Sequence, residues 1–346
     1  MSAAAIVGTG FMGRVHAEAL ARIGVDVRGV VGSSPERAAA AGLGPVYANL
    51  AEMLDDDSVD VVHVCSPNHL HHAQVVAAMR AGKHVVCEKP LAMTPAQAQE
   101  LCDLATERGL VNAVCFLSRF YPLCQTAAAR VDDGSVGTVR MVSGHYLQDW
   151  LADAADWNWR VDPALGGQLR VVGDIGSHWL DLVSHVSGQR VESVLADLTT
   201  VYPNRDGVAV TTEDMAGVLL RFDGGARGVL TLSQVSPGRK NRLSFEVSGS
   251  AASLGWNSET PDQLWIGHRD EPNQALVRGD GDYPPGHAQG YPDAFKALFR
   301  AVYDAVDETA PCNAGYPTFD DGREQVLVGE AIAASARLGG WSPVRR

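Results

Sequence analysis

The chain opens with Ala4-Ala5-Ile6-Val7-Gly8-Thr9-Gly10-Phe11-Met12-Gly13, a short apolar run joined directly to three spaced glycines. A helical pattern then continues to Ile23. Strand, glycine-rich turn and helix in this order form the context in which such a motif binds a dinucleotide. Gly8 would permit the tight turn, Gly10 would let the backbone approach a pyrophosphate, and Gly13 would let the helix pack closely on the strand. The amides at the helix N-terminus would then face the phosphates.

A chance glycine-rich turn is the alternative, and the sequence up to residue 122 argues against it. Apolar runs and helical patterns alternate over this part of the chain, and the expected strands are 25–31, 59–65, 84–87 and 111–116. Ser34, Asn68 and Thr94 are expected to cap the helices between them. The alternation predicts a doubly wound parallel sheet, that is, an α/β dinucleotide-binding Rossmann domain over residues 1–122.

Beyond residue 122 the pattern changes to longer alternating segments joined by tight turns. We expect strands at 139–146, 191–201, 216–222, 226–234 and 243–247, with weaker ones near Leu264 and Leu276. Turns such as Asp223-Gly224-Gly225 indicate hairpins. The pattern predicts an α+β domain over residues 123–346, built on a large, mainly antiparallel open sheet.

The two faces of that sheet would have different neighbours. One face would carry the helix that starts near Val172, and the other would bury against a second copy of the chain. Alternate apolar residues need burial of this kind, among them Val218, Leu220, Val229 and Leu232. The helix expected at 318–339 could pack back on the first domain.

Composition excludes several classes of protein. The 346 residues carry a net charge of −13, which argues against nucleic-acid or membrane surfaces as partners. No apolar run approaches the about 20 residues that span a bilayer. The N-terminus shows no charged leader, so we expect no signal peptide. The cysteines form no Cys-x-x-Cys pair, which predicts reduced, buried thiols in a cytoplasm and no disulfide or metal site. They are Cys65, Cys87, Cys102, Cys115, Cys124 and Cys312.

A candidate catalytic lysine lies in the stretch Gly82-Lys83-His84-Val85-Val86-Cys87-Glu88-Lys89-Pro90. The β-branched run predicts a buried strand, so Glu88 and Lys89 would lie at its carboxyl end. Ligands of open α/β sheets bind at that edge. The nicotinamide of a bound cofactor would lie there, between Pro67 and the Glu88-Lys89 pair. Taken alone, the stretch favours a solvated lysine in a turn, and two later stretches reverse that preference.

The choice of cofactor depends on the residues after the second strand. An acidic residue that binds the ribose 2′-hydroxyl is expected about 20 residues past the glycines. Gly32-Ser33-Ser34 stands there instead, and Arg37 lies in the next helix. Small hydroxyl residues with an arginine suit a 2′-phosphate. The alternative, held equal, is that Ser34 only caps the helix and Arg37 only faces water.

The second domain carries a candidate acid/base pair in Gly173-Asp174-Ile175-Gly176-Ser177-His178. Asp174 and His178 are four residues apart on a predicted helix, so their side chains would share one face. A carboxylate beside an imidazole raises its basicity, and histidine titrates near neutral pH. Such a pair could remove a proton from a substrate hydroxyl. The alternative is a helix-start aspartate that binds free amides and a histidine packed in the core.

A tryptophan-rich run precedes this pair, Asp156-Trp157-Asn158-Trp159-Arg160. Exposed aromatic faces stack on sugar rings, and arginine donates hydrogen bonds in a fixed fork. The run therefore favours a carbohydrate-binding segment, and a core tryptophan cluster is the alternative.

With these motifs in order, the chain resembles the Gfo/Idh/MocA oxidoreductases over nearly its whole length. The matching stretches are Gly8 to Gly13, Ser66-Pro67-Asn68-His69-Leu70-His71, Ala81 to Pro90, and Asp174 to His178. The resemblance implies nicotinamide-dependent oxidation of an alcohol, or reduction of a ketone, on a sugar, inositol or related polyol. It also implies that Lys89 contacts the reacting hydroxyl and that His178, paired with Asp174, transfers the proton. The missing ribose-binding acid departs from NAD-preferring members of the family.

The sequence thus predicts an NAD(P)-dependent dehydrogenase, with NADP(H) slightly favoured, that assembles as a homodimer or homotetramer. The alternatives are a glycosidase that uses bound NAD transiently and a non-catalytic dinucleotide or sugar sensor. The candidate catalytic residues are Lys89, Asp174 and His178. The candidate cofactor-binding residues are Gly8, Gly10, Phe11, Met12, Gly13, Ser33, Ser34, Arg37, Ser66, Pro67, Asn68, His71, Glu88 and Lys89. The candidate substrate-binding residues are Arg119, Tyr146, Trp157, Trp159, Arg160, His287 and Tyr291.

Overall fold

The chain folds into two compact units, seen in a computed structural model that describes residues 2–277, 283–284, 287–309 and 315–346. The first unit comprises Met1–Leu117 with Tyr291–Val326, and the second comprises Ser118–Gly290 with Leu327–Arg346. The expected division at residue 122 is simpler than this, because a segment from the C-terminal part of the chain belongs to the first unit.

The first unit contains a parallel sheet of five strands in the order β2-β1-β3-β4-β5. Its elements are β1 (Ala4–Val7), α1 (Phe11–Ile23), β2 (Val27–Val31), α2 (Pro35–Ala41), α3 (Leu50–Leu54), β3 (Val61–Val64), α4 (Asn68–Arg80), β4 (His84–Cys87), α5 (Pro95–Arg108) and β5 (Asn112–Val114). The strands are almost wholly buried, as sequences rich in valine and alanine require in a sheet covered on both faces. The predicted Rossmann sheet is confirmed.

Two of the three expected helix caps in this unit are present. Ser34 accepts a hydrogen bond from the Arg37 amide at 3.3 Å, and Thr94 accepts one from the Gln97 amide at 3.3 Å. The expectation for Asn68 is wrong, because Pro67 occupies the N-cap position and Asn68 is the first residue of α4.

The segment Tyr291–Val326 joins the first unit through two helices, α9 (Tyr291–Val306) and the first part of α10 (Phe319–Leu338). The apolar face of α9 is buried and packs its aromatic rings against α1 and β3. Phe319 at the start of α10 belongs to the core beneath the sheet. These faces need apolar partners, and the Rossmann unit supplies them.

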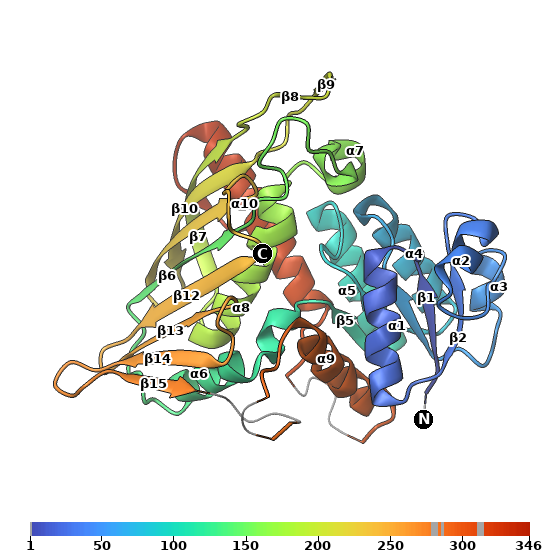
Figure 1. The fold of residues 1–346 in the computed structure, drawn as a ribbon, viewed down its shortest axis with the longest axis horizontal. Helices are drawn as coiled ribbons and strands as arrows, with labels where there is room; N and C mark the ends of the chain where they lie inside the picture. The colour runs from blue at the N-terminus through green and yellow to red at the C-terminus, as the bar shows by residue number, and fades with distance from the viewer. Residues whose placement is uncertain (1, 278–282, 285–286, 310–314) are drawn as a thin grey trace. The chain divides into compact units, whose positions relative to one another are not determined.

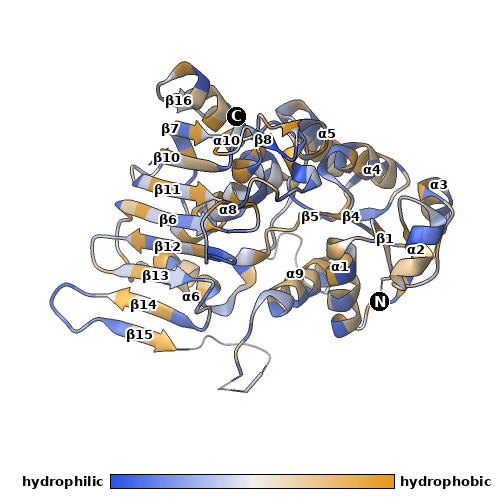
Figure 2. Cartoon of the chain, turned by 45° about the horizontal axis from the view of Figure 1, so that its top comes forward, coloured by the Kyte–Doolittle hydropathy of each residue, from blue (hydrophilic) through white to orange (hydrophobic). Residues whose placement is uncertain are grey.

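The second unit is built on a sheet of nine strands in the order β15-β14-β13-β12-β6-β11-β10-β7-β16, laid side by side in Figure 2. All neighbouring pairs are antiparallel except β6 with β11. Its strands are β6 (Met141–Leu147), β7 (Val191–Thr199), β8 (Asn204–Arg205), β9 (Val208–Ala209), β10 (Met215–Phe222), β11 (Arg227–Ser233), β12 (Arg242–Ser248), β13 (Ser253–Asn257), β14 (Gln263–Gly267), β15 (Gln274–Val277) and β16 (Ser342–Pro343). Its helices and helical turns are η1 (Leu117–Phe120), which begins at the unit boundary, α6 (Pro122–Asp132), η2 (Trp159–Val161), α7 (Pro163–Gly166), η3 (Val172–Gly176) and α8 (Ser177–Ser187).

Helices α6 and α8 cover one face of this sheet (Figure 1). The sequence predicts α8 there, as the helix that starts near Val172, but not α6. Strict alternation along β10 and β11 separates the two faces. Val218, Leu220 and Leu232 lie on the covered face and are buried, whereas Val229 lies on the open face with 41% of its surface exposed. The expected need for a partner subunit is therefore wrong for the first three, because their own unit already buries them.

Two further structural features concern the helices and the cysteines. Within the described ranges, no helix combines the length and apolar character that a membrane span requires. Cys65, Cys87, Cys102, Cys115 and Cys124 are free thiols, and Cys312 lies outside the described residues.

Candidate active site

The glycine turn after β1 has the geometry that its sequence predicts. Gly8 has a φ of +101°, and a Cβ there would lie 2.6 Å from the Cys65 backbone. A Cβ on Gly13 would lie 2.0 Å from the Gly8 carbonyl oxygen, so only glycine permits this helix–strand contact. A Cβ on Gly10 would meet nothing within 4 Å. The turn is therefore packed closely against backbone at Gly8 and Gly13, and it is open at Gly10, next to the N-terminus of the helix. This geometry fits a bound dinucleotide.

The loop after β2 brings Ser33 and Arg37 together. The Arg37 Nη1 donates to the Ser33 hydroxyl at 3.5 Å. Ser34 uses its own hydroxyl to cap α2. The structure thus gives Ser34 the capping role and leaves Ser33 with Arg37 as an exposed hydroxyl–guanidinium pair.

His71 connects the loops that come after β3 and β4. Its Nε2 lies 2.8 Å from the Ser66 carbonyl oxygen, and its Nδ1 lies 2.8 Å from the Pro90 carbonyl oxygen. Burial lowers the pKa of His71, while hydrogen bonds to these two carbonyls oppose the shift. This ring contacts backbone on both sides, so it fixes the spacing of two loops expected at the nicotinamide.

Glu88 and Lys89 come after β4 at the carboxyl edge of the sheet. Glu88 is buried, and its Oε2 accepts a hydrogen bond from the Lys89 amide at 3.1 Å. Its Oε1 lies 3.2 Å from Nε2 of His16, a buried residue of α1. Lys89 is half-buried, and its peptide bond to Pro90 is cis. The carboxylate of Glu88 therefore binds inside the first unit and holds the backbone of Lys89.

In the second unit, the Asp174 carboxylate contacts an arginine and a glutamine side chain. Its Oδ1 lies 3.2 Å from Nε of Arg160, and its Oδ2 accepts a hydrogen bond from Nε2 of Gln234 at 2.8 Å. Asp174 lies in the π-helical turn η3, which continues directly into α8. Such turns are frequent at functional sites. Gln234 comes just after the end of β11, and sequence reasoning gave no sign of its part here.

His178 lies one turn later, on α8, and is 8% exposed. The Tyr146 ring lies beside it, with 6.4 Å between ring centroids. The Tyr146 hydroxyl donates to Oδ1 of Asn241 at 2.7 Å. Burial, reinforced by the Asp174 charge, raises the pKa of Tyr146, so this hydroxyl stays protonated. Tyr146 thus contributes a neutral, fixed ring next to the imidazole.

The tryptophan-rich run lies close to Asp174 through Arg160. The Arg160 guanidinium stacks over the Trp159 ring at 4.4 Å from its centroid. Trp157 is 48% exposed. An arginine held by a carboxylate and an aromatic ring is rigid, and the exposed Trp157 face is available to a ligand.

Three other candidates have contacts that the sequence did not suggest. Arg119 forms a bidentate ion pair with the buried Asp181 of α8, at 2.8 and 2.5 Å. Nδ1 of His287 lies 3.1 Å from the Pro284 carbonyl oxygen in its own loop. The Tyr291 hydroxyl lies 3.7 Å from the sulfur of Met12, beside the glycine turn of the first unit.

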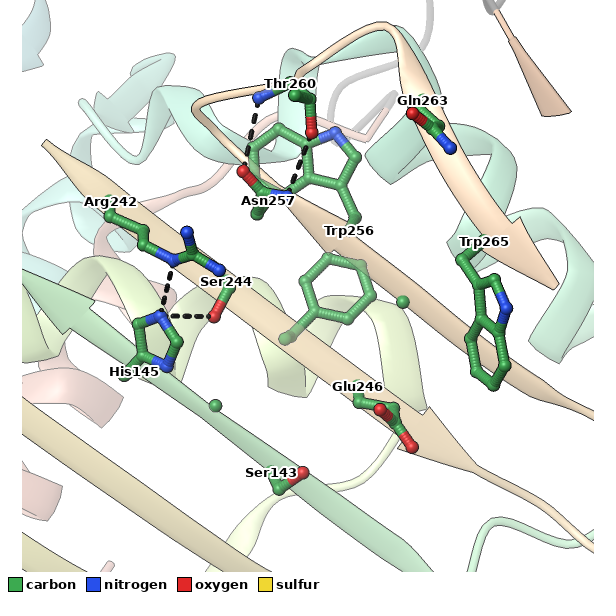
Figure 3. Close-up of a pocket in the computed structure, with 13 residues that line it drawn as sticks. Ser143, His145, Arg242, Ser244, Glu246, Trp256, Asn257, Thr260, Gln263 and Trp265 are labelled. Carbon is green, nitrogen blue, oxygen red and sulfur yellow. Dashed lines mark hydrogen bonds between the residues drawn. The ribbon is translucent and has the colours of Figure 1, made fainter. Parts of the chain in front are cut away.

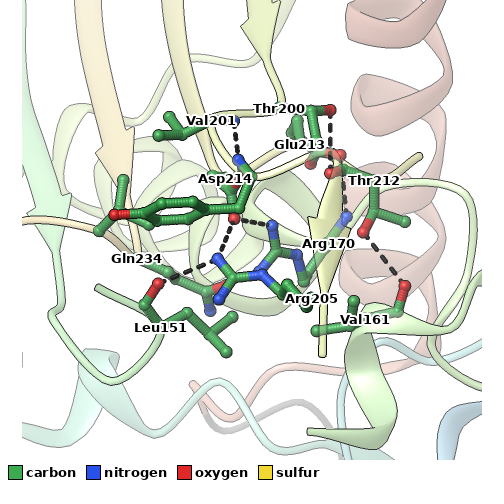
Figure 4. Close-up of polar contacts among 12 residues, drawn as sticks. Leu151, Val161, Arg170, Thr200, Val201, Arg205, Thr212, Glu213, Asp214 and Gln234 are labelled. Atoms are coloured by element: carbon green, nitrogen blue, oxygen red, sulfur yellow. Dashed lines mark hydrogen bonds and ion pairs between the residues drawn. The ribbon is translucent and has the colours of Figure 1, made fainter. Parts of the chain in front are cut away.

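A buried charge network holds the chain at Arg170, four residues before Asp174 (Figure 4). Arg170 and Arg205 both bind the Asp214 carboxylate, and all three side chains are wholly buried. Arg205 also donates to the Leu151 carbonyl oxygen at 2.9 Å. Glu213 accepts from the Arg170 amide at 3.1 Å. The network therefore ties the loop that leads to the tryptophans to the turn that carries Asp174.

A hollow of about 470 Å³ lies on the open face of the second sheet (Figure 3). Arg242 Nε donates to Nε2 of His145 at 2.9 Å, and the Ser244 hydroxyl lies 3.0 Å from the same atom. Trp265 lines its rim. The hollow is on the face opposite α8, which carries His178, so it is separate from the acid/base pair.

The fold and these groups define a class: a dinucleotide-binding unit joined to an open-sheet unit that carries a carboxylate and an imidazole. A family model described as oxidoreductase family, NAD-binding Rossmann fold, matches residues 3–116. A second, described as GFO/IDH/MocA C-terminal domain, matches residues 124–255. The chain belongs to the GFO/IDH/MocA family of NAD-binding oxidoreductases.

Individual relatives match over nearly the whole chain. Levoglucosan dehydrogenase of Pseudarthrobacter phenanthrenivorans is 29% identical over 382 residues, covering 98% of this chain and 97% of that protein. The 1,5-anhydro-D-fructose reductase of Ensifer adhaerens is 30% identical over 337 residues, covering 93% and 92%. The structure of levoglucosan dehydrogenase in complex with NADH and levoglucosan matches with a TM-score of 0.93 at 28% identity, covering 99% of each chain.

Proposed function

We propose that this protein is an NAD(P)-dependent dehydrogenase that oxidises a secondary hydroxyl of a sugar or related polyol, or reduces the corresponding ketone. The observation that carries the proposal is the Asp174 carboxylate, held by Arg160 and Gln234 one turn before the buried His178. The exposed Trp157 supports a sugar as the ligand, because aromatic faces stack on sugar rings. The names of the relatives support the same substrate class.

The residues of the chain would share the chemistry with the cofactor. When bound, the nicotinamide supplies the hydride acceptor for oxidation or the hydride donor for reduction. Lys89 contacts the reacting oxygen and stabilises the negative charge that develops on it. His178 accepts the hydroxyl proton during oxidation and returns it during reduction. Asp174 orients the imidazole and stabilises its charged form.

The direct test of this function is a substrate screen. Sugars, anhydrosugars and inositols are incubated with NAD or NADP, and the absorbance of free reduced nicotinamide is followed. We expect stoichiometric reduction with at least one sugar. Sugar hydrolysis without net reduction would instead indicate a glycosidase that regenerates its cofactor. Binding of sugar with no turnover in either direction would indicate a sensor.

The lysine role has its own test. Lys89→Ala should lower kcat by about 10²-fold or more, in the range of lost electrostatic stabilisation. Dinucleotide affinity should change little, because the glycine turn is untouched. Lys83→Ala is the matched control, since Lys83 lies six positions earlier and donates to the Asp56 carbonyl oxygen at 2.9 Å. Near wild-type turnover of Lys89→Ala would remove Lys89 from the mechanism.

For the cofactor we propose NADP(H), on the ground that Ser33 and Arg37 lie together where a ribose-binding acid is absent. The NADH complex of levoglucosan dehydrogenase supports the opposite choice. If Arg37 binds a 2′-phosphate, Arg37→Ala should weaken NADP binding by about 1.5–3 kcal/mol and leave NAD binding unchanged. Equal effects on both dinucleotides, or a wild-type preference for NAD, would make Arg37 a surface residue only.

We also propose that the open face of the second sheet pairs with a second copy, giving a homodimer or homotetramer. Apolar residues on the strands laid out in Figure 2 are exposed there: Met141, Met215, Leu219, Val229 and Trp265. Monomers rarely leave such a patch uncovered. Sedimentation at micromolar concentration should give a multiple of 36.7 kDa, and Leu219→Asp should reduce it. A single species of monomer mass in the wild type would contradict this.

A further inference from the structure

A buried row of polar side chains crosses the interior of the first unit and ends at Lys89. The Tyr303 hydroxyl of α9 lies 3.1 Å from Nε2 of His63. Nδ1 of His63 lies 3.0 Å from Nδ1 of His16. Nε2 of His16 lies 3.2 Å from Oε1 of Glu88, whose Oε2 accepts from the Lys89 amide. Both histidines are 0% exposed, and Tyr303 and Glu88 are 4% and 5% exposed.

We propose that His16 and His63 are positioning residues: with Tyr303 they form a directed chain of hydrogen bonds that holds Glu88 as an ion against the backbone of Lys89. Nothing in the proposed reaction uses these side chains. The inference rests on the proposed function only in making Lys89 the catalytic lysine.

Counting protons gives the chain of hydrogen bonds its direction. A neutral imidazole has one N–H donor and one bare nitrogen acceptor. The contact between the two Nδ1 atoms therefore needs a proton on one of them and none on the other. If His63 donates, His16 carries its own proton on Nε2, facing Glu88, and His63 presents a bare Nε2 to the Tyr303 hydroxyl. Each contact in this row is then a hydrogen bond, and the carboxylate accepts from both His16 and the Lys89 amide. The Cys115 sulfur lies 3.7 Å from the same Nε2 of His16, and sulfur is a weak acceptor for that N–H.

The opposite direction is less favourable. If His16 donated through Nδ1, its bare Nε2 would face Glu88, which would then have to carry a proton. A carboxylate that receives two N–H donors is instead stabilised as the ion. In the first arrangement Glu88 is the single charge among the four side chains.

The surroundings favour neutral rings. Phe299 packs against both imidazoles, with centroid distances of 4.7 Å to His16 and 4.8 Å to His63. Burial, and the proximity of His16, lower the pKa of His63. Burial also raises the pKa of Tyr303, helped by the charges of Asp60 and Asp307, so its hydroxyl remains a donor.

Three thiols and His71 also lie near Glu88. The thiols come from the ends of three strands: Cys65 after β3, Cys87 at the end of β4 and Cys115 after β5. Burial raises the pKa of each thiol, so all three are neutral. Burial lowers the pKa of His71, although both of its ring nitrogens face backbone carbonyl oxygens. The three thiols therefore add no charge that would reverse the direction of the hydrogen bonds.

The same atoms could instead bind a metal ion. The ligand atoms of His16, Glu88 and Cys115 lie within 4.8 Å of one another, close enough to share one ion. A metal there would take Nε2 of His16 as a ligand and remove its proton. The hydrogen-bonded chain requires that proton, so the two arrangements exclude each other.

The test is the tautomer of each ring, measured by long-range ¹H–¹⁵N correlation on histidine-labelled full-length protein. His16→Gln and His63→Gln assign the two signals. We expect His16 as the Nε2–H tautomer and His63 as the Nδ1–H tautomer. The same tautomer at both positions, the reversed pair, or an imidazolium at either would overturn the proposal. Stoichiometric zinc in the purified protein, lost in Cys115→Ala, would also overturn it.

Two variants connect the hydrogen-bonded chain to Lys89. Glu88→Gln removes the charge and offers an N–H to His16, so we expect both tautomers to reverse and kcat to fall about tenfold or more, with an altered pH–rate profile. Phe299→Leu is the packing control, since that ring contacts both histidines without a hydrogen bond, and it should leave both tautomers as in the wild type. Unchanged tautomers in Glu88→Gln would overturn the proposal. Reversed tautomers with unchanged turnover would leave the hydrogen bonds in place and count against the role of Lys89.

Discussion

Two carboxylates, one in each unit, stand beside the two proposed catalytic side chains, and their surroundings differ. Glu88 is buried among imidazole rings and thiols; its Oε1 lies 3.2 Å from Nε2 of His16, and its Oε2 accepts a hydrogen bond from the Lys89 amide. Asp174 is partly exposed and binds a guanidinium and an amide side chain. Glu88 therefore acts on backbone, where only position matters. In the proposed mechanism Asp174 lies near an imidazole that gains and loses a proton. Its own negative charge is partly compensated by Arg160, whose Nε lies 3.2 Å from Oδ1.

This contrast indicates that the role of a carboxylate near a reacting group is not defined by its residue type. In a dry interior, a single charge with two N–H donors is a rigid anchor. Near the surface, a carboxylate that already has a cationic partner tunes its neighbour only in part. The environments of Glu88 and Asp174 can each be tested by separate substitutions.

The largest effect is expected at the imidazole itself. His178→Asn should lower kcat/KM by about 10²–10⁴-fold, the usual contribution of general acid–base catalysis. His185→Asn, the same substitution two turns further along α8, is the control and should stay near wild type. The measurement is steady-state kinetics with the substrate that the screen identifies. Retention of both rate and pH dependence by His178→Asn would refute the acid/base assignment, and Tyr291 or His287 would be tested next.

The buried network around the Asp174 turn should have a large effect on stability. Asp214→Asn leaves two wholly buried guanidinium groups without their shared carboxylate, which should cost about 3–5 kcal/mol of unfolding free energy. Lys240→Ala removes an ion pair with Asp149 in which the lysine is 83% exposed, and it should cost at most about 1 kcal/mol. Urea denaturation measures both. Equal losses of unfolding free energy in the two variants would mean that the buried network stabilises this region no more than an exposed ion pair does.

The compensation by Arg160 predicts opposite shifts of the pH–rate profile. Asp174→Asn removes the charge that favours the imidazolium, so the acid limb of kcat/KM should move to lower pH. Arg160→Gln frees that charge, so the limb should move to higher pH. Activity should fall in both variants by about tenfold, which corresponds to roughly 1.4 kcal/mol. The limb belongs to the coupled pair, so the profiles are compared at saturating cofactor. Shifts in the same direction would contradict the compensating role of Arg160.

The smallest effect concerns the buried histidines of the first unit and the dependence of the unfolding free energy on pH. Burial lowers the pKa of both His63 and His71 below the ordinary value of 6.5. The unfolded chain then binds more protons than the folded one below pH 6.5, so stability is lost as pH falls from there. Each histidine contributes a slope of at most about 1.4 kcal/mol per pH unit. His63→Gln should therefore reduce the slope of the unfolding free energy against pH by the contribution of one histidine.

The exposed His69 of α4 provides the control for that slope. His69→Gln should leave the acid dependence of the unfolding free energy as in the wild type. Denaturation curves between pH 5 and 7 give both comparisons. An unchanged slope in His63→Gln would mean that His63 takes up no additional proton on unfolding.

Local sequence was sufficient for much of the fold because its signals act over short range. The glycines after β1, the valine-rich strands and the alternation along β10 and β11 each report burial or turn geometry within a few residues. The same local logic identified Glu88 and Lys89 as strand-end residues. The π-helical turn at Asp174 was not predicted, because it interrupts a pattern typical of one continuous helix.

The amino-acid sequence alone was therefore enough for the parallel and the mainly antiparallel sheet, the glycine turn and the family. The pairing of distant polar groups required the folded chain: Gln234 with Asp174, Arg119 with Asp181, and His16 with His63 and Glu88. These partners lie 47 to 72 positions apart, and no local periodicity encodes them. The assignment of the segment from Tyr291 onward to the first unit likewise came from packing. The physical reason is that a buried polar group must find its partner wherever the chain brings one.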